Sequence, residues 1–310
     1  MKERLSKTQT DYRLQVLGGV LVFIGAILLS SKAVIVKLAY QYEVDSTSLL
    51  ALRFSFALPF YAFIYWWKRG QFHKYGPISK RDWTKVIVYG ILGYYLASLL
   101  DFNGLRYITA SMERLILFLY PTIVVLANAF FFRAKINRFQ VMALVLTYIG
   151  ISLAFFEGLH LSNQPNFALG GFLVFLCAIC YAFYLLGSGD LIPRLGTVRF
   201  TSLALMVSSL AILLHHLIVY QWDLFDFAWQ VYALSFLMAL VATVIPTFLV
   251  SEGIRLIGSS NAAIIGSVGP ISTIILAYFF LDERLGSLQI LGTVIVIGGV
   301  LIISLKKKTQ

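Results

Sequence analysis

Charged side chains interrupt several segments of this 310-residue sequence that are otherwise apolar. They are four cations and two anions: Lys32, Lys37, Arg53, Arg114, Asp101 and Glu113. A charge at the centre of a bilayer costs about 2.5–3.5 kcal/mol on insertion scales, so it usually faces a partner or a water-filled cavity. Such side chains can bind a polar solute or an ion, although Lys37 and Arg53 stand near segment ends and could equally reach lipid headgroups.

Glu113 is the strongest candidate, because it lies about one and a half turns inside its helical segment, in TASMERLILFLY at residues 109–120. We hypothesise that Glu113 lines a cavity and either pairs with a substrate ammonium group or carries a coupling proton. Lys32 and Arg114 are its expected charged neighbours. Asp101 is a second candidate carboxylate, with a position at the external end of its helix as the alternative interpretation.

Polar and aromatic residues recur at helical spacing in these segments. Shared faces are expected for Tyr94, Ser98 and Asp101, for Glu113 and Tyr120, for Cys177, Tyr181, Tyr184 and Ser188, and for Thr243 and Thr247. Asn261 completes the candidate substrate-binding set. Such stripes in membrane bundles also serve interhelical packing and hydrogen bonding, so both interpretations stay open for each residue.

The elements that position these residues are expected to be membrane helices. Hydrophobic residues make up 59% of the chain and charged residues only 13%, which is typical of a multispanning membrane protein. A hydrocarbon core about 30 Å thick needs roughly 20 apolar residues per helix. We predict an all-α integral membrane protein with ten spans, at 16-40, 46-67, 83-103, 108-132, 139-157, 168-189, 199-219, 228-250, 259-281 and 288-305.

The basic residues indicate how these spans are oriented. The formal net charge is +11, and most of the 25 Lys and Arg fall in the two tails and in the connections on the same side. The positive-inside rule then predicts a multi-pass protein of the inner (plasma) membrane with both termini in the cytoplasm. We attribute the basic charge to topology and anionic lipid headgroups, and we expect no nucleic-acid partner.

The sequence contains an internal repeat, in which residues 104–150 align without gaps to residues 253–299. The matched pairs include Gly104 with Gly253, Arg106 with Arg255, Pro121 with Pro270 and Gln140 with Gln289. The full repeat unit around each aligned stretch holds five predicted helices, an odd number, so the second unit enters the membrane in the opposite orientation. We predict two inverted repeats at 16-157 and 168-305, between tails at 1-15 and 306-310. Such folds place the substrate site near the midplane and work by alternating access.

The stretch GPISTIILAYFFLDERLGSLQILGTVIVIGGVLI contains a proline-bearing helix, an L-x-E-R-L turn at Glu283 and Arg284, and a Gln- and Gly-containing helix start. With these motifs the whole chain resembles the drug/metabolite transporter superfamily, specifically its ten-helix EamA type. Lys37 and the pair at 53–54 also fit the family pattern. The resemblance implies a transporter whose cavity is built from helices one, three, four, six, eight and nine.

The resemblance also implies that the fourth and ninth helices move, and each holds a proline at the equivalent place. Proline lacks a backbone donor and permits a kink, so we predict Pro121 and Pro270 as gating residues, with inherited geometry as the alternative. The chain departs from the family in two places. Ala134 occupies the position of the acidic Glu283 in the second copy, and LSSK at 29–32 replaces a common Trp-Gly pair.

Three short motifs suggest other chemistry. The C-x-x-C at 177–180 lies in an apolar helix with no further cysteine, and the two histidines at 215–216 are adjacent, so neither predicts a metal or redox site. The GSGD at 187–190 resembles the GxGD of intramembrane aspartyl proteases, but the expected topology separates Asp190 from Asp101. We keep this protease as the enzyme alternative and otherwise expect no enzyme, no metal and no cofactor.

Taken together, these features favour a transporter of small metabolites that works by alternating access. We predict an exporter of amino acids or related amphoteric or amphiphilic solutes, with the direction implied by the resemblance alone. Organic anions such as nucleotides or sugar phosphates are the alternative, because the embedded charges are positive in sum. The expected partners are the substrate, membrane lipids and protons as coupling ion, and a homodimer is left open. Glu113 aligns with Ala262, so its charge is a specialisation of one half.

Overall fold

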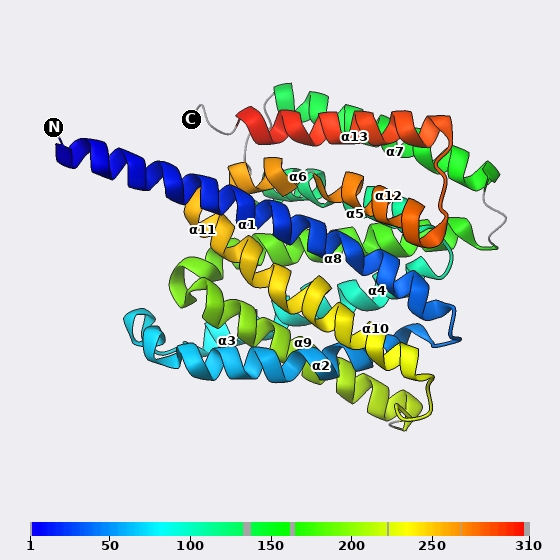
Figure 1. Ribbon diagram of the computed structural model, residues 1–310, viewed down its shortest axis with the longest axis horizontal. Coiled ribbons are helices and arrows are strands. Elements are labelled where there is room, and N and C mark those ends of the chain that lie inside the picture. The colour runs from blue at the N-terminus through cyan, green and yellow to red at the C-terminus, as the bar shows by residue number, and fades with distance from the viewer. Residues whose placement is uncertain (1, 133–137, 162–164, 222, 267, 307–310) are drawn as a thin grey trace.

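The computed structural model describes residues 2–132, 138–161, 165–221, 223–266 and 268–306, and within them the chain is helical, without strands. The helices pack side by side, and most run roughly parallel or antiparallel across the molecule (Figure 1). The α-helices are α1 (Lys2–Tyr40), α2 (Ser46–Lys68), α3 (Lys80–Gly90), α4 (Ala97–Leu105), α5 (Ala110–Leu117), α6 (Tyr120–Phe132), α7 (Arg138–Leu161), α8 (Phe167–Leu195), α9 (Thr197–Tyr220), α10 (Trp229–Ala239), α11 (Ile245–Gly266), α12 (Val268–Leu281) and α13 (Ser287–Lys306). The 3-10 helix η1 spans Arg69–Tyr75, and the π-helical turns η2 and η3 span Ile91–Leu96 and Leu240–Val244.

Seven helical stretches among the described residues are long and apolar enough to cross a membrane. They are Leu14–Tyr40, Ser46–Tyr75, Lys80–Leu105, Ala110–Phe131, Phe167–Leu195, Thr197–Tyr220 and Trp229–Gly253. Three shorter apolar helices, Leu144–Leu159, Val268–Leu281 and Ser287–Gly299, lie where the other three spans are expected. The chain is therefore an all-helical, multi-pass membrane protein, and the count of ten spans stays a prediction.

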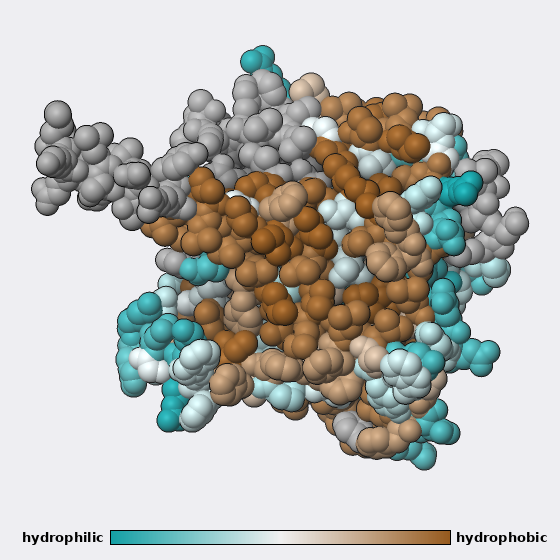
Figure 2. Space-filling view, in the orientation of Figure 1, coloured by the Kyte–Doolittle hydropathy of each residue, from teal (hydrophilic) through white to brown (hydrophobic). Residues whose placement is uncertain are grey.

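The outer surface carries large apolar side chains across the middle of the molecule, with polar residues at the two ends of the helices (Figure 2). Phe130 and Phe279, which the internal repeat pairs, are 81% and 73% exposed. Aromatic rings at such exposure are unfavourable in water and suited to lipid, so this band is the lipid-facing surface. The largest buried cluster lies inside the bundle, where Phe54, Tyr61, Phe102 and Met238 are buried together.

The π-helical turns interrupt two helices at equivalent places. Extending the repeat alignment toward the N-terminus superposes Ile91, the first residue of η2, on Leu240, the first residue of η3. Single π-helical turns re-aim the side chains that follow them and are frequent at functional sites. Here η2 presents Tyr94 and η3 presents Thr243, two residues of the candidate set.

One expected span is two helices. Residues 108-132 divide into α5 and α6 at Phe118 and Leu119, and α6 begins at Tyr120. Pro121 explains the break, because its ring lacks an N–H and would clash with the carbonyl of residue 117 in a continuous helix. At the start of a new helix its missing donor costs nothing. Pro270 stands at the matching place, in the first turn of α12.

The corresponding connection in the second half has a different local structure. The connection predicted between spans 228-250 and 259-281 is helical, because α11 continues to Gly266 before α12 begins at Val268. In the first half, the side chains of Thr109 and Glu283 bind the backbone N–H groups that open α5. Their counterparts in the repeat are Gly258 and Ala134, which have no oxygen to offer. Without these caps nothing stops the helix there.

Helices α7 and α13 pack closely enough that their backbones touch at two glycines. A Cβ added at Gly150 would lie 2.6 Å from the carbonyl oxygen of Gly292, and Val296 packs beside them. Small residues at such crossings let membrane helices approach and gain van der Waals contact. This pair therefore holds the helix that ends the first half against the helix that ends the second.

We expect Gly292→Ala to lower the apparent melting temperature of the purified protein, because its methyl group would overlap a backbone oxygen that cannot rotate away. Overpacking of this kind costs about 1–3 kcal/mol. Gly298→Ala is the matched control, since a Cβ at Gly298 meets no atom within 4 Å. Differential scanning fluorimetry of both variants in detergent gives the comparison, and equal melting temperatures would contradict the packing argument.

Candidate functional site

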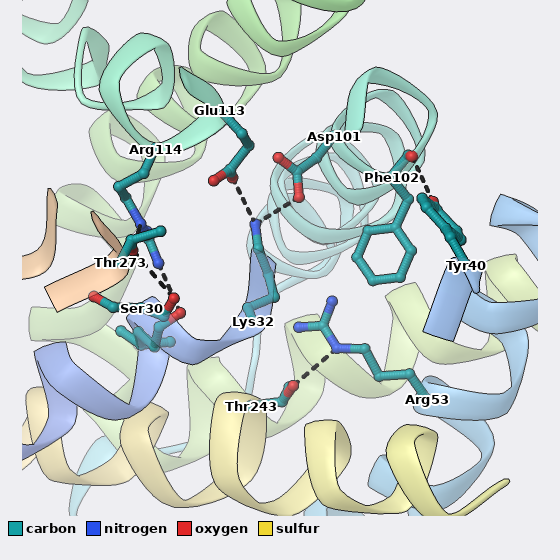
Figure 3. Close-up of polar contacts among 11 residues, drawn as sticks. Ser30, Lys32, Tyr40, Arg53, Asp101, Phe102, Glu113, Arg114, Thr243 and Thr273 are labelled. Carbon is teal, nitrogen blue, oxygen red and sulfur yellow. Dashed lines mark hydrogen bonds and ion pairs between the residues drawn. The ribbon is translucent and has the colours of Figure 1, made fainter. Parts of the chain in front are cut away.

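One buried ammonium group binds two carboxylates inside the bundle. Lys32 Nζ on α1 lies 2.5 Å from Asp101 Oδ2 on α4 and 3.1 Å from Glu113 Oε1 on α5 (Figure 3). The Lys32 side chain is 14% exposed, and those of Asp101 and Glu113 are 2% and 0% exposed. Asp101 is therefore buried and paired, one turn before the end of α4, and three helices converge to place these charges together.

The triad leaves acidic oxygen atoms unused. Asp101 Oδ1 and Glu113 Oε2 are buried and have no hydrogen-bond partner among the residues that the structure describes. When both carboxylates are ionised, the three groups together carry a net negative charge. Buried carboxylate oxygens are costly unless they are paired, so this arrangement favours a second cation or a hydrogen-bond donor.

Arg114 points away from the triad and ties three helices together. Its Nε donates to Thr273 Oγ1 on α12 at 3.1 Å, and its Nη2 donates to the carbonyl oxygen of Leu29 on α1 at 2.7 Å. Thr273 in turn donates to the carbonyl of Ser30, and Ser30 Oγ donates to the carbonyl of Gly269. The small polar residues of the LSSK segment thus bind α12, and Arg114 is a structural tie.

Arg53 on α2 is buried beside the triad and does not reach the headgroups, which was one of its two expected roles. It is 5% exposed, and its Nε donates to Thr243 Oγ1 on η3 at 2.8 Å. Its guanidinium carbon lies 5.1 Å from the Phe54 ring centroid and 5.5 Å from that of Phe102. Two aromatic faces and one hydroxyl therefore hold the cation in place.

Tyrosines from three helices form a wall in contact with one another. The Tyr94 and Tyr184 hydroxyls lie 3.4 Å apart, and the Tyr181 ring stacks on that of Tyr184 with centroids 5.9 Å apart. Tyr120 meets Tyr181 edge to face at 5.1 Å. Cys177, one turn before Tyr181, is close enough to the triad to interact with its charges electrostatically. Of the predicted face of α8, Cys177 therefore lies nearest the triad, and Tyr181 and Tyr184 belong to the tyrosine wall.

The remaining candidates lie at varied places. Thr247 lies on α11, four residues after Thr243 of η3, and accepts a 3.5 Å hydrogen bond from the hydroxyl of Tyr61. Ser98 is half-buried on α4, and Lys37 is half-buried near the end of α1, within electrostatic range of Glu283. The side chain of Asn261 lies outside the described part of the chain. Sequence reasoning missed Thr273 and Ser30, which take part in the hydrogen bonds around Arg114. Their only signal in the sequence is that they are polar residues within apolar helices.

Glu283, from the L-x-E-R-L turn, caps the N-terminus of α5. Its Oε1 accepts from the backbone N–H of Ala110 at 2.8 Å, and its Oε2 accepts from the N–H and the hydroxyl of Ser111 at 3.1 and 2.8 Å. A carboxylate at this end also interacts favourably with the helix dipole. The turn of the second half therefore fixes the short helix that carries Glu113.

The residues of the expected protease motif lie in a different setting. Asp190 pairs with Lys85 and, at 2.8 Å, with Arg194, and its side chain is 51% exposed. Arg194 also pairs with Asp82 at 2.8 Å, so this network joins α3 to α8. Asp101 has Lys32 as its partner instead. Among the described residues there is also no group of three or more His, Cys, Asp or Glu arranged for a metal ion.

The chain matches a known family in both of its halves. A model of the EamA-like transporter family matches residues 15–156 and again residues 168–305. The chain belongs to the EamA-like transporter family. Its membrane helices and its family identify it as a multi-pass membrane transporter.

The chain is also similar, over most of its length, to uncharacterized transporters. The chain is 30% identical over 293 residues to the uncharacterized transporter YcbK of Bacillus subtilis, covering 93% of this chain and 92% of that protein. It is 24% identical over 265 residues to the uncharacterized transporter sll1319 of Synechocystis sp., covering 84% and 79%. A solved structure described as "Crystal structure of protein" has a TM-score of 0.63 at 17% identity, covering 94% of this chain and 98% of that chain. That likeness supports the fold.

We expect Glu283→Ala to loosen the first turn of α5, because three hydrogen bonds and a favourable charge are lost. Loss of a helix cap costs about 1 kcal/mol, so the apparent melting temperature should fall and amide hydrogen exchange should quicken at residues 110–113. Arg284→Ala, at the exposed neighbouring position, is the control. Unchanged exchange at 110–113 in Glu283→Ala would show that α5 needs no cap.

Proposed function

We propose that this EamA-family protein transports small amphoteric solutes, such as amino acids or related metabolites, by alternating access. One observation supports this most directly: two buried carboxylates share one ammonium and keep one unpaired oxygen each. A solute that carries an ammonium group supplies the missing donors. The aromatic wall of Tyr120, Tyr181 and Tyr184 offers an apolar surface for the rest of such a solute.

Lys32 has a defined part in this proposal. In the absence of solute it neutralises part of the negative charge, because a buried carboxylate without any partner is strongly destabilising. When a solute ammonium binds Asp101 and Glu113, Lys32 is released from at least one of them. Separating Lys32 from its carboxylates costs energy, and the solute ammonium compensates that cost when it binds in place of Lys32. Solute binding is thereby coupled to a rearrangement of these contacts between α1, α4 and α5.

The ten-span architecture with inverted repeats belongs to the same proposal. The two family matches and the equivalent positions of η2 and η3 both support a duplication. The described ends of the chain lie on the same side of the molecule, which is also the side of the basic η1 segment (Figure 1). This arrangement supports cytoplasmic termini in the inner (plasma) membrane. Export, which the resemblance suggests, and proton coupling through a carboxylate such as Glu113 are further parts of the proposal.

Polar contacts between the halves support movement of one half against the other. Near the α5 end, Glu283 binds Ser111 and Arg114 binds Thr273. Near η1, Lys85 of the first half pairs with Asp190 of the second. Alternating access requires that contacts of this kind open in turn on the two sides. The helix break beside Pro121 and the first turn of α12, which holds Pro270, are the proposed hinges.

The test of the site is a ligand-stabilisation screen followed by transport in proteoliposomes. Amino acids that stabilise the wild-type protein should lose at least tenfold in affinity in Asp101→Asn and in Glu113→Gln, because each removes one charge that binds the ammonium. Asp226→Asn, in an exposed connection, is the matched control. Stabilisation by nucleotides or sugar phosphates alone, unaffected by either variant, would instead favour an anion transporter.

The topology is tested by fusing reporters to each terminus. A fluorescent protein that folds in the cytoplasm should be bright at both ends, and alkaline phosphatase, which is active only outside, should be inactive at both. The same phosphatase inserted after Asp226, in the connection between α9 and α10, should be active. An odd number of crossings would place the two termini on opposite sides and would refute the ten-span proposal.

A further inference from the structure

Arg53 has hydrogen-bonding capacity that the fold does not use. The side chain is 5% exposed and its Nε is bound by Thr243, yet its Nη1 has no hydrogen-bond partner among the described residues. A buried guanidinium nitrogen in this condition is costly, because it has given up its water without a replacement. The rings of Phe54 and Phe102 compensate the charge in part, but a ring face cannot satisfy a row of N–H donors.

The second arginine of the same region shows the contrast. Arg114 donates from Nε to Thr273 and from Nη2 to the carbonyl of Leu29, so its fork is held by the protein on two sides. The role of Arg114 as a tie between helices is complete. Arg53 is tied by one nitrogen only, which leaves the far side of its fork open.

That open side faces the triad. The Arg53 guanidinium lies below Lys32 and Asp101 and is directed toward them in Figure 3. It is close enough to Asp101 for the two charges to attract each other. The two nevertheless form no ion pair within 4.0 Å in the described structure, where Asp101 pairs with Lys32. The buried cation of Arg53 and the buried anion of Asp101 therefore lie near each other without direct contact.

We propose that Arg53 binds the carboxylate of a zwitterionic substrate whose ammonium group binds Asp101 and Glu113. This inference rests on the proposed function and specifies its substrate class as solutes with an ammonium and a carboxylate on the same carbon atom, as in α-amino acids. A planar guanidinium presents two parallel donors that match the two oxygens of a carboxylate. Inside the bundle such a solute loses its hydrogen bonds to water. The unpaired Nη1 of Arg53 and the unpaired oxygens of Asp101 and Glu113 would replace them.

The arrangement also gives the substrate a place between moving parts. Arg53 is bound to η3 of the second half through Thr243, whereas Asp101 and Glu113 belong to α4 and α5 of the first half. A solute held at both ends therefore joins the first-half carboxylates to an arginine whose position is set by the second half. A solute with only one of the two charged groups would make half of this connection.

The experiment compares each free amino acid with two derivatives that differ from it by one charge. The twenty common L-amino acids, their methyl esters and their N-acetyl forms are screened for thermal stabilisation of the purified full-length protein, and dissociation constants are measured for every acid that stabilises it. The wild type should bind a free acid about 10- to 100-fold more tightly than its ester, since a hydrogen-bonded charge is lost. The N-acetyl form should also bind more weakly than the free acid.

Variants locate the carboxylate contact. Arg53→Gln should bind the free acid and the ester equally, while it keeps its preference for the free acid over the N-acetyl form. Arg53→Lys keeps a charge without the fork and should retain an intermediate preference for the acid. Arg114→Gln is the matched control, in which the acid-to-ester ratio should equal that of the wild type even though the protein becomes less stable.

Several outcomes would overturn the inference. Equal affinity of the wild type for acid and ester refutes it without any variant, so the test does not depend on whether Arg53→Gln folds. An equal loss for acid and ester in Arg53→Gln would show that Arg53 acts only as a structural tie. The proposed function itself is refuted by either of two other results. In one, the N-acetyl forms bind as tightly as the free acids; in the other, no compound with a free amine binds.

Discussion

The position of one buried ammonium group governs the architecture around it. Lys32, Asp101 and Glu113 are almost fully removed from solvent, and each would be strongly destabilising there without the other two. Three helices must therefore meet within hydrogen-bonding distance, and their connections must allow it. The short helix α5, the break before α6 and the π-helical turn before α4 are local departures from regular helix that accompany this meeting.

The two halves of the chain have divided their roles around this constraint. In the first half α5 begins at a capped turn and carries Glu113, whereas the second half has Ala262 at that place and a helix that continues without interruption. The missing caps at Gly258 and Ala134 are consistent with the missing charge, because a helix that holds no buried carboxylate has no need of a fixed start. The second half instead supplies hydroxyls, from Thr243 and Thr273, that hold the arginines.

Much of this arrangement could be predicted from composition and periodicity, and some of it could not. Apolar length and basic-residue placement indicate helical membrane spans, and the faces with Tyr94 and Tyr184 follow from helical spacing. The pairing of Lys32 with Asp101 as well as Glu113 depends on how α1 crosses α4 and α5, which no local pattern encodes. The continuation of α11 to Gly266 was not predicted, because apolar length alone does not show whether the connection between two spans is helical.

Arg53 shows why position along a span is a poor guide to function. Its place near the start of α2 suggested a side chain that reaches headgroups. However, Asp45 precedes α2 and caps it by accepting from the backbone N–H groups of Thr47 and Ser48, and the first two turns of the helix are buried. The helix therefore enters the bundle at once. Interhelical hydrogen bonds in membranes contribute only roughly 0.6 kcal/mol on average, so a single bond from Arg53 to Thr243 cannot by itself compensate a buried guanidinium. The rings of Phe54 and Phe102 compensate part of the charge, and the proposed substrate carboxylate would compensate the rest.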